Sequence, residues 1–174
     1  MVTTMLADLL VQYKAIEFGD FTLASGAKST YYIDVKTAVT HPDLLAAVAS
    51  EVAGSYGFDV VAGVAVGGVP LAVAVSIASK KPYAIIRSSG KDHGKKDLII
   101  GDVRGKDVLL IEDVTTSGGS ALYGIEVLRS AGARADRVVT VVDREQGAGE
   151  TLAKHGVTIM PLVRVSDLVQ GRNF

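Results

Sequence analysis

The chain has 174 residues, which predicts one domain with room for a full hydrophobic core. Its formal net charge of −1 at pH 7 gives no overall field that would attract nucleic acid or an anionic membrane, so any anion site must be local. The absence of cysteine excludes disulfides, thiolate nucleophiles and cysteine-bound metals, and it fits a cytoplasmic location. Met1 leads into the sequence without a basic stretch, so we expect no signal peptide.

The N-terminal part of the chain combines a helix with a turn-rich stretch. Between Leu6 and Tyr13, apolar residues recur with the spacing of one helical face. Residues 18–40 are rich in aromatic and turn-forming residues and predict short strands and loops. A further helix is predicted over residues 41–57, because Pro42 suits a first helical turn and glycines stand near the end.

Strand and helix patterns alternate along the rest of the chain. Strands are predicted at residues 59–66, 82–87, 107–113, 137–143 and 157–163, and helices at residues 69–80, 120–132 and 147–156. The strand segments are continuous apolar runs, which indicates burial on both faces. We therefore predict an α/β fold, a doubly wound parallel sheet of about five strands with flanking helices.

One uncharged stretch, Val60 to Ser79, is long enough to cross a membrane. Gly67, Gly68 and Pro70 interrupt it in the middle, and its first half is rich in β-branched residues. A buried strand, a turn and a buried helix explain this pattern better than a membrane span.

The segment from residue 108 to 128, VLLIEDVTTSGGSALYGIEVL, places two acids and a small polar loop between a strand and a helix. Residues 108–111 fill the strand, so Glu112 and Asp113 should emerge at its carboxyl end, where ligands bind in such sheets. The helix should begin near Ser120, and the free N–H groups before it favour an anion. The acids cannot contact that anion, and they need ribose hydroxyls or a diphosphate-bound Mg²⁺. The segment thus predicts a binding site for a phosphorylated sugar. The alternative is a strand end with surface acids followed by a helix cap.

Residues 88–105 interrupt the alternation with a polar, basic stretch that is long for a connection. Five basic side chains fall within residues 87–96, at the start of this stretch: Arg87, Lys91, His93, Lys95 and Lys96. The alternative explanation is a solvated charged loop. Each charge-assisted hydrogen bond to a ligand would stabilise the closed loop by about 1.5–3 kcal/mol. Fixing the backbone of each loop residue costs about 1–2 kcal/mol. We therefore expect this loop to close only over a highly charged group such as a diphosphate.

The segment around Glu112 and Asp113 resembles the phosphoribosyl pyrophosphate (PRPP) motif of type I phosphoribosyltransferases. Three other segments narrow the resemblance to the orotate phosphoribosyltransferase family: FGDFTLASGAKSTYYID at 18–34, KDHG at 91–94 and VVDREQG at 141–147. The resemblance implies a single domain over residues 1–174. It would have an N-terminal hood at about 1–40 and a PRPP-binding core at about 41–165.

The resemblance also implies the roles of individual residues. Arg87, Lys91, His93 and Asp113 would be catalytic, with the basic loop shared between the two subunits of a homodimer. PRPP would contact Arg87, Ser88, Lys91, His93, Glu112, Asp113, Val114, Thr115, Thr116, Ser117, Gly118, Gly119, Ser120 and Ala121. Orotate would contact Thr116 and Arg144; the alternative for Arg144 is an ion pair with Asp143 or Glu145. Mg²⁺ would be the cofactor, held mainly by PRPP rather than by direct protein ligands.

The sequence departs from the family pattern at three positions where relatives often carry a basic residue. These positions are occupied by Ala24, Gly67 and Ser88. Backbone N–H groups of Gly67 and Gly68 are an alternative source of diphosphate contacts. Lys95 or Lys96 could assist in binding the diphosphate, although neither matches a family position.

The reaction implied by the resemblance is transfer of the 5-phosphoribosyl group from PRPP to orotate in cytoplasmic pyrimidine (UMP) biosynthesis. Its products would be orotidine 5′-monophosphate and diphosphate. One alternative is a phosphoribosyltransferase for a purine or another base, which should lack the 18–34 segment. A second is a non-catalytic regulator that senses PRPP, and a third is a fused enzyme that also decarboxylates the product. No nucleic-acid or membrane partner is expected.

Overall fold

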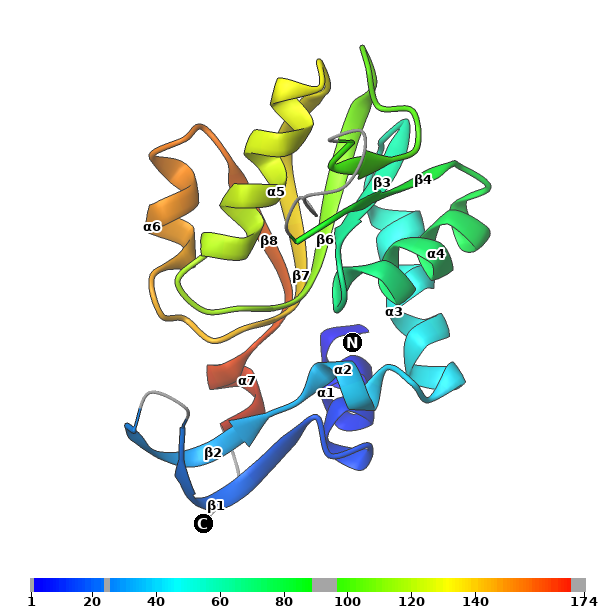
Figure 1. The fold of residues 1–174 in the computed structure, drawn as a ribbon. Coiled ribbons are helices and arrows are strands. Elements are labelled where there is room, and N and C mark those ends of the chain that lie inside the picture. Colours follow the sequence, from blue (N-terminus) through cyan, green and yellow to red (C-terminus); the bar gives the residue numbers. More distant parts are fainter. Residues whose placement is uncertain (1, 24–25, 89–96, 170–174) are drawn as a thin grey trace.

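The computed structural model describes residues 2–23, 26–88 and 97–169, and its centre is a six-stranded sheet (Figure 1). The strands in spatial order are β5 (Ile99–Ile100), β4 (Tyr83–Ile86), β3 (Val60–Val64), β6 (Asp107–Thr115), β7 (Arg134–Asp143) and β8 (Thr158–Arg164). All neighbours pair in parallel except β5, which pairs antiparallel with β4. The predicted parallel α/β sheet is confirmed, and the two-residue edge strand β5 is an addition that the sequence did not predict.

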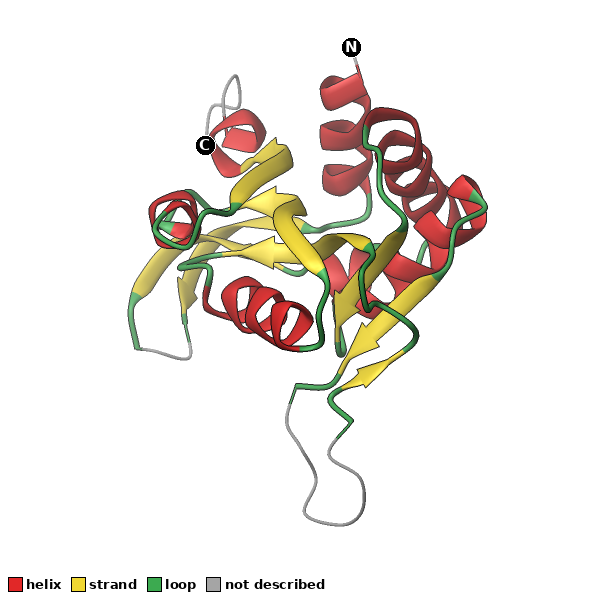
Figure 2. Ribbon diagram, turned by 90° about the horizontal axis from the view of Figure 1, so that it is seen from above, coloured by secondary structure: helices red, strands yellow, loops and turns green. Residues whose placement is uncertain are grey.

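Helices lie on both sides of the sheet (Figure 2). One side carries α1 (Val2–Gln12), α3 (Pro42–Ser55), α4 (Gly68–Ser79) and α7 (Val165–Val169), and the other carries α5 (Gly119–Ser130) and α6 (Ala148–Ala153). Alternate residues of one strand enter the two cores: Leu109 and Ile111 face the first set of helices, and Val108 and Leu110 face the second. This two-sided burial explains why the strands read as continuous apolar runs.

The N-terminal segment covers the carboxyl end of the sheet (Figure 1). It forms an antiparallel hairpin of β1 (Ile16–Thr22) and β2 (Lys28–Ile33), followed by the short helix α2 (Val35–Ala38). Ile16, Val35 and Ala38 are buried in the same core as α3 and α4, so this segment is packed against the sheet domain. The packing places α2 against β6.

A tight turn connects β3 to α4 within the stretch that resembled a membrane span. A Cβ atom on Gly63 would lie 2.3 Å from the Gly68 carbonyl oxygen, so the strand and the helix approach closely only because both positions are glycine. The predicted order of strand, turn and helix is confirmed, although the strand ends at Val64 rather than at residue 66 and the helix begins at Gly68 rather than at residue 69. Among the described residues, no helix has the length and apolar character needed to cross a membrane.

Candidate active site

The two acids lie inside strand β6 rather than beyond its end. We expected the strand to be filled by residues 108–111, but β6 continues to Thr115 because it stays paired with β7 as far as Asp143. Glu112 is 4% exposed and Asp113 6% exposed. The expectation that they emerge at the strand end was therefore wrong. Both carboxylates are nevertheless within the last four residues of the strand, at the edge where ligands bind.

Neighbouring residues of a strand point to opposite faces, and the two carboxylates follow this rule. Glu112 Oε1 accepts a hydrogen bond from Ser120 Oγ at 3.1 Å, on the side of α5. Burial, and then the negative charge of Asp113, raises the pKa of Glu112 to about 7. Asp113 turns to the other side, where a Cβ atom on Gly67 would lie 2.6 Å from its carboxyl carbon. Only glycine fits beside this carboxylate.

Lys36 is a charged residue of this site that the sequence did not single out. Its Nζ atom lies 3.0 Å from Asp113 Oδ2, and the hydrogen bond between the two groups raises the pKa of the Lys36 ammonium. Lys36 comes from α2, 77 positions before Asp113 in the chain (113 − 36). No local pattern could have shown that the two side chains meet.

The loop after β6 has the features expected of an anion site. Thr116 and Ser117 are exposed, and Gly118 adopts the left-handed conformation, with φ of 87°, just before α5. The first turn of α5 receives no hydrogen bond from a capping side chain, so its N–H groups are available to a ligand. Gly118 also packs against α6, since an added Cβ atom would lie 3.2 Å from Ala148 Cα.

Other predicted phosphate-loop residues have partners within the protein. The Ser120 hydroxyl donates to Glu112, and the Thr115 hydroxyl donates to Asp143 at 3.3 Å. Val114 is half-buried against the core and Ala121 is buried, so their side chains offer no polar contact. These positions can contribute backbone groups to a ligand.

The loop after β7 leaves Arg144 without the ion pair that was considered as an alternative. Asp143 Oδ1 instead accepts hydrogen bonds from the Thr115 hydroxyl and, at 2.9 Å, from the Glu145 backbone N–H. Glu145 Oε2 accepts a hydrogen bond from the Ser166 backbone N–H. Both acids beside Arg144 are therefore engaged elsewhere.

The Arg144 guanidinium lies over the ring of Tyr31, 5.5 Å from its centroid. Its Nε atom is buried and has no hydrogen-bond partner in the part of the chain that the structure describes. The Arg144 backbone N–H donates to the Thr115 carbonyl at 2.9 Å, which fixes the residue next to the end of β6. A guanidinium with a buried, unpaired Nε atom beside the loop after β6 is suited to a carboxylate ligand.

The basic segment begins at an anchored point. Arg87 and Ser88 are exposed after β4, and the Arg87 carbonyl accepts a hydrogen bond from the Tyr123 hydroxyl at 2.7 Å. Tyr123 is a second residue that the sequence did not single out. Lys91, His93, Lys95 and Lys96 lie outside the described residues, as does Ala24.

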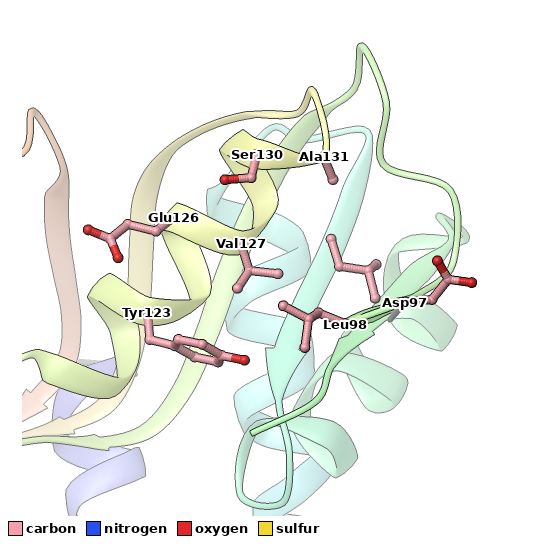
Figure 3. A pocket seen from close by; sticks show the side chains of 8 residues that line it. Asp97, Leu98, Tyr123, Glu126, Val127, Ser130 and Ala131 are labelled. Atoms are coloured by element: carbon pink, nitrogen blue, oxygen red, sulfur yellow. The ribbon is translucent and has the colours of Figure 1, made fainter. Parts of the chain in front are cut away.

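Tyr123 also lines a groove of about 400 Å³ between α5 and the segment that leads into β5 (Figure 3). Asp97 and Glu126 border the groove, and the apolar side chains of Leu98 and Val127 form part of its wall. Neither Glu112 nor Asp113 lines this groove, so it is not the proposed site of sugar binding.

Comparison with known proteins agrees with this geometry. A family model described as a phosphoribosyl transferase domain matches residues 38–160. An orotate phosphoribosyltransferase of Methanocorpusculum labreanum is 66% identical over 97% of this chain and 99% of its own length. The chain belongs to the orotate phosphoribosyltransferase family. Of the alternatives left open by the sequence, the relatives support the orotate enzyme rather than a purine enzyme or a regulator.

Solved orotate phosphoribosyltransferases have the same fold as this chain. The crystal structure of the Mycobacterium tuberculosis enzyme with Fe(III) dicitrate is 31% identical, with a TM-score of 0.84 over 97% of this chain and 99% of that one. The same enzyme in complex with PRPP has a TM-score of 0.79 at 29% identity, with the same coverage of both chains. The agreement extends over the N-terminal hairpin as well as the sheet, because nearly all of both chains is covered.

Proposed function

We propose that this orotate phosphoribosyltransferase transfers the 5-phosphoribosyl group from PRPP to orotate in pyrimidine biosynthesis, giving orotidine 5′-monophosphate and diphosphate. One observation carries the proposal: a buried carboxylate pair, Glu112 and Asp113, stands directly before an uncapped helix N-terminus at Gly118. This arrangement supplies acceptors for sugar hydroxyls next to donors for a phosphate.

In the proposed complex, the ribose 5′-phosphate accepts hydrogen bonds from backbone N–H groups and hydroxyls of residues 115–120. The ribose hydroxyls donate to Asp113 and Glu112. The departing diphosphate leaves a ribosyl cation-like transition state, and orotate is already an anion that can attack it without a general base. The protein would therefore act by positioning the two substrates and by stabilising the charge on the diphosphate.

The proposed orotate contacts come from Thr116 and Arg144. Thr116 is exposed in the loop after β6, and the guanidinium of Arg144 has an unpaired Nε atom. A guanidinium can bind the orotate carboxylate through two parallel hydrogen bonds. The ring of Tyr31 would limit the directions that Arg144 can take, because it lies against the guanidinium.

The proposed diphosphate contacts are Arg87, Ser88, Lys91 and His93, with Mg²⁺ as the cofactor. The donor set fits a magnesium ion held mainly by the substrate, because Mg²⁺ keeps several waters and binds phosphates with one or two carboxylates. Asp113 and Glu112 are the carboxylates of the proposed site, and no cluster of three or more metal-binding side chains occurs among the described residues. The ion would neutralise charge on the diphosphate as it departs.

We further propose that the enzyme is a cytoplasmic homodimer whose two active sites each use a basic loop from the partner. Exposed apolar side chains on the β3–α4 turn, α4, β4 and β5 support an interface on this side: Val66, Ile77, Tyr83 and Ile100. Residues 1–174 would act as one domain, with the hood at about 1–40 and the core at about 41–165. Sedimentation equilibrium should give twice the monomer mass.

A substrate comparison tests the proposed reaction. The purified protein is given PRPP and Mg²⁺ together with orotate, adenine, hypoxanthine or uracil in separate reactions, and diphosphate release is measured. We expect release with orotate only. Release with a purine and not with orotate would overturn the assignment of the base.

A further inference from the structure

The short helix α2 holds one lysine at a fixed place beside the two acids. Val35 and Ala38 are buried, and Asp34 caps the helix by accepting a hydrogen bond from the Thr37 backbone N–H at 3.0 Å. The backbone of Lys36 is therefore anchored, while its side chain is 60% exposed and remains adjustable. Because Asp113 is buried, the Lys36 ammonium can leave it only when other hydrogen-bond donors take its place.

A cavity of about 290 Å³ lies next to this ion pair. It is lined by Lys36, Val66, Gly67, Val69 and Pro70, so Lys36 provides the charge among its lining residues. The wall opposite Lys36 is the turn between β3 and the start of α4. A cation facing a helix start is an arrangement that favours a highly charged anion.

The position of this cavity relative to the proposed PRPP site indicates which part of the ligand reaches it. The phosphate loop leaves β6 toward α6, because Gly118 packs against Ala148. Gly67 and Lys36 approach Asp113 from the opposite side, where β3 lies next to β6 (Figure 1). A ribose with its 5′-phosphate in the loop and its hydroxyls at Asp113 therefore directs its diphosphate toward the cavity.

We propose that Lys36 is a diphosphate-binding residue that pairs with Asp113 in the free enzyme and transfers to the diphosphate when PRPP binds. This inference rests on the proposed function and adds a residue to it. The ribose hydroxyls replace the ammonium at Asp113, so the carboxylate keeps a partner in both states. The released ammonium then meets a group of several negative charges, which attracts it more strongly than one carboxylate does.

A purely structural role for Lys36 predicts a different pattern of binding, and three ligands separate the two explanations. Calorimetry in the presence of Mg²⁺ measures the affinity for PRPP, for diphosphate alone and for ribose 5-phosphate. The variants are Lys36→Met, which keeps the length without the charge, and Lys36→Arg, which keeps the charge. Lys154→Met serves as the control, because Lys154 is exposed at the far end of α6.

Lys36→Met should lower the affinity for PRPP and for diphosphate by about 10- to 100-fold, the effect of losing one charge-assisted hydrogen bond. Ribose 5-phosphate should bind as well as before or more tightly, because its hydroxyls no longer compete with the ammonium for Asp113. Lys36→Arg should retain most of the diphosphate affinity, and Lys154→Met should change nothing.

Equal losses for ribose 5-phosphate and diphosphate would overturn the inference, since Lys36 would then only hold Asp113 in place. Unchanged diphosphate affinity in a folded Lys36→Met protein would also overturn it, and the proposed function would survive either result. Failure of the unaltered protein to bind PRPP would instead overturn the proposed function, and the inference with it.

Discussion

The loops after β6 and β7 have the same backbone design and different polar partners. Each follows a buried parallel strand, and each ends in a left-handed glycine before a helix without a side-chain cap: Gly118 has φ of 87° and Gly147 has φ of 97°. In the second loop, Asp143 is bound by the Thr115 hydroxyl and by a backbone N–H. Before the first loop, Asp113 near the end of β6 has the flexible ammonium of Lys36 as its partner.

On the proposed function, this difference separates a strand end that binds substrate from one that holds its own loop together. The topology of the sheet brings both loops to the same edge. Asp143 has its partners within its own loop and neighbouring strand, so it holds the loop together. The partner of Asp113 is a side chain that can move away, and after β7 the buried Nε atom of Arg144 has no hydrogen-bond partner among the described residues. The groups proposed to bind substrate are therefore those whose hydrogen-bond partners are movable or missing in the free protein.

The largest expected effect comes from replacing each aspartate by alanine. Asp113→Ala should lower kcat/KM by about 100-fold, because charge-assisted hydrogen bonds to the ribose are lost. Its unfolding free energy should change little, since Lys36 is exposed. Asp143→Ala should instead lower the unfolding free energy by about 1–3 kcal/mol, because a buried hydroxyl and an N–H lose their acceptor. Steady-state kinetics and urea denaturation measure the two effects. Similar stability losses in both variants would remove the distinction between the loops.

Arg144→Ala tests the role of the cation after β7. We expect the KM for orotate to rise by about 10- to 100-fold, the effect of losing a paired hydrogen bond to a carboxylate. The affinity for PRPP should remain unchanged, because the proposed contact of Arg144 is with the base and not with the sugar. Initial rates with each substrate varied in turn measure both values. Equal losses for orotate and PRPP would contradict a role at the base.

Glu112→Gln tests the cost of burying the second acid. The folded protein holds the Glu112 proton up to a pKa of about 7, against an ordinary value of 4.5. As the pH rises between these values, the unfolded chain releases a proton that the folded protein keeps, so stability falls and stays low above pH 7. The variant should therefore be more stable than the parent at pH 8 by up to about 3 kcal/mol, and the difference should vanish near pH 4.5. Thermal unfolding across this range measures it; a constant difference would show that Glu112 does not titrate this way.

The smallest expected effects come from the two left-handed glycines. Gly147→Ala should cost about 1–2 kcal/mol of stability from backbone conformation alone, since nothing lies within 4 Å of the added Cβ atom. Gly118→Ala should cost more, because its Cβ atom would lie 3.2 Å from Ala148 Cα. Gly118→Ala should also lower the affinity for PRPP, whereas Gly147→Ala should leave this affinity unchanged. Equal PRPP affinities in the two variants would argue against a phosphate at Gly118.

The sequence predicted those parts of the molecule that leave a pattern among residues close together in the chain. Continuous apolar runs predicted the parallel strands, because burial on both faces leaves a local pattern. The acids and the small polar loop after residue 111 also form a local pattern, which predicts an anion site there. Lys36 was not predicted, since its contact with Asp113 joins distant segments. The edge strand β5 has only two residues, Ile99 and Ile100, and is too short to show a periodicity.

The structure of the protein with PRPP and Mg²⁺ tests the central claim most directly. We predict that the ribose 5′-phosphate lies against the backbone N–H groups of residues 116–119 and that a ribose hydroxyl lies within hydrogen-bonding distance of Asp113. PRPP bound elsewhere, with this edge of the sheet unchanged, would contradict the account.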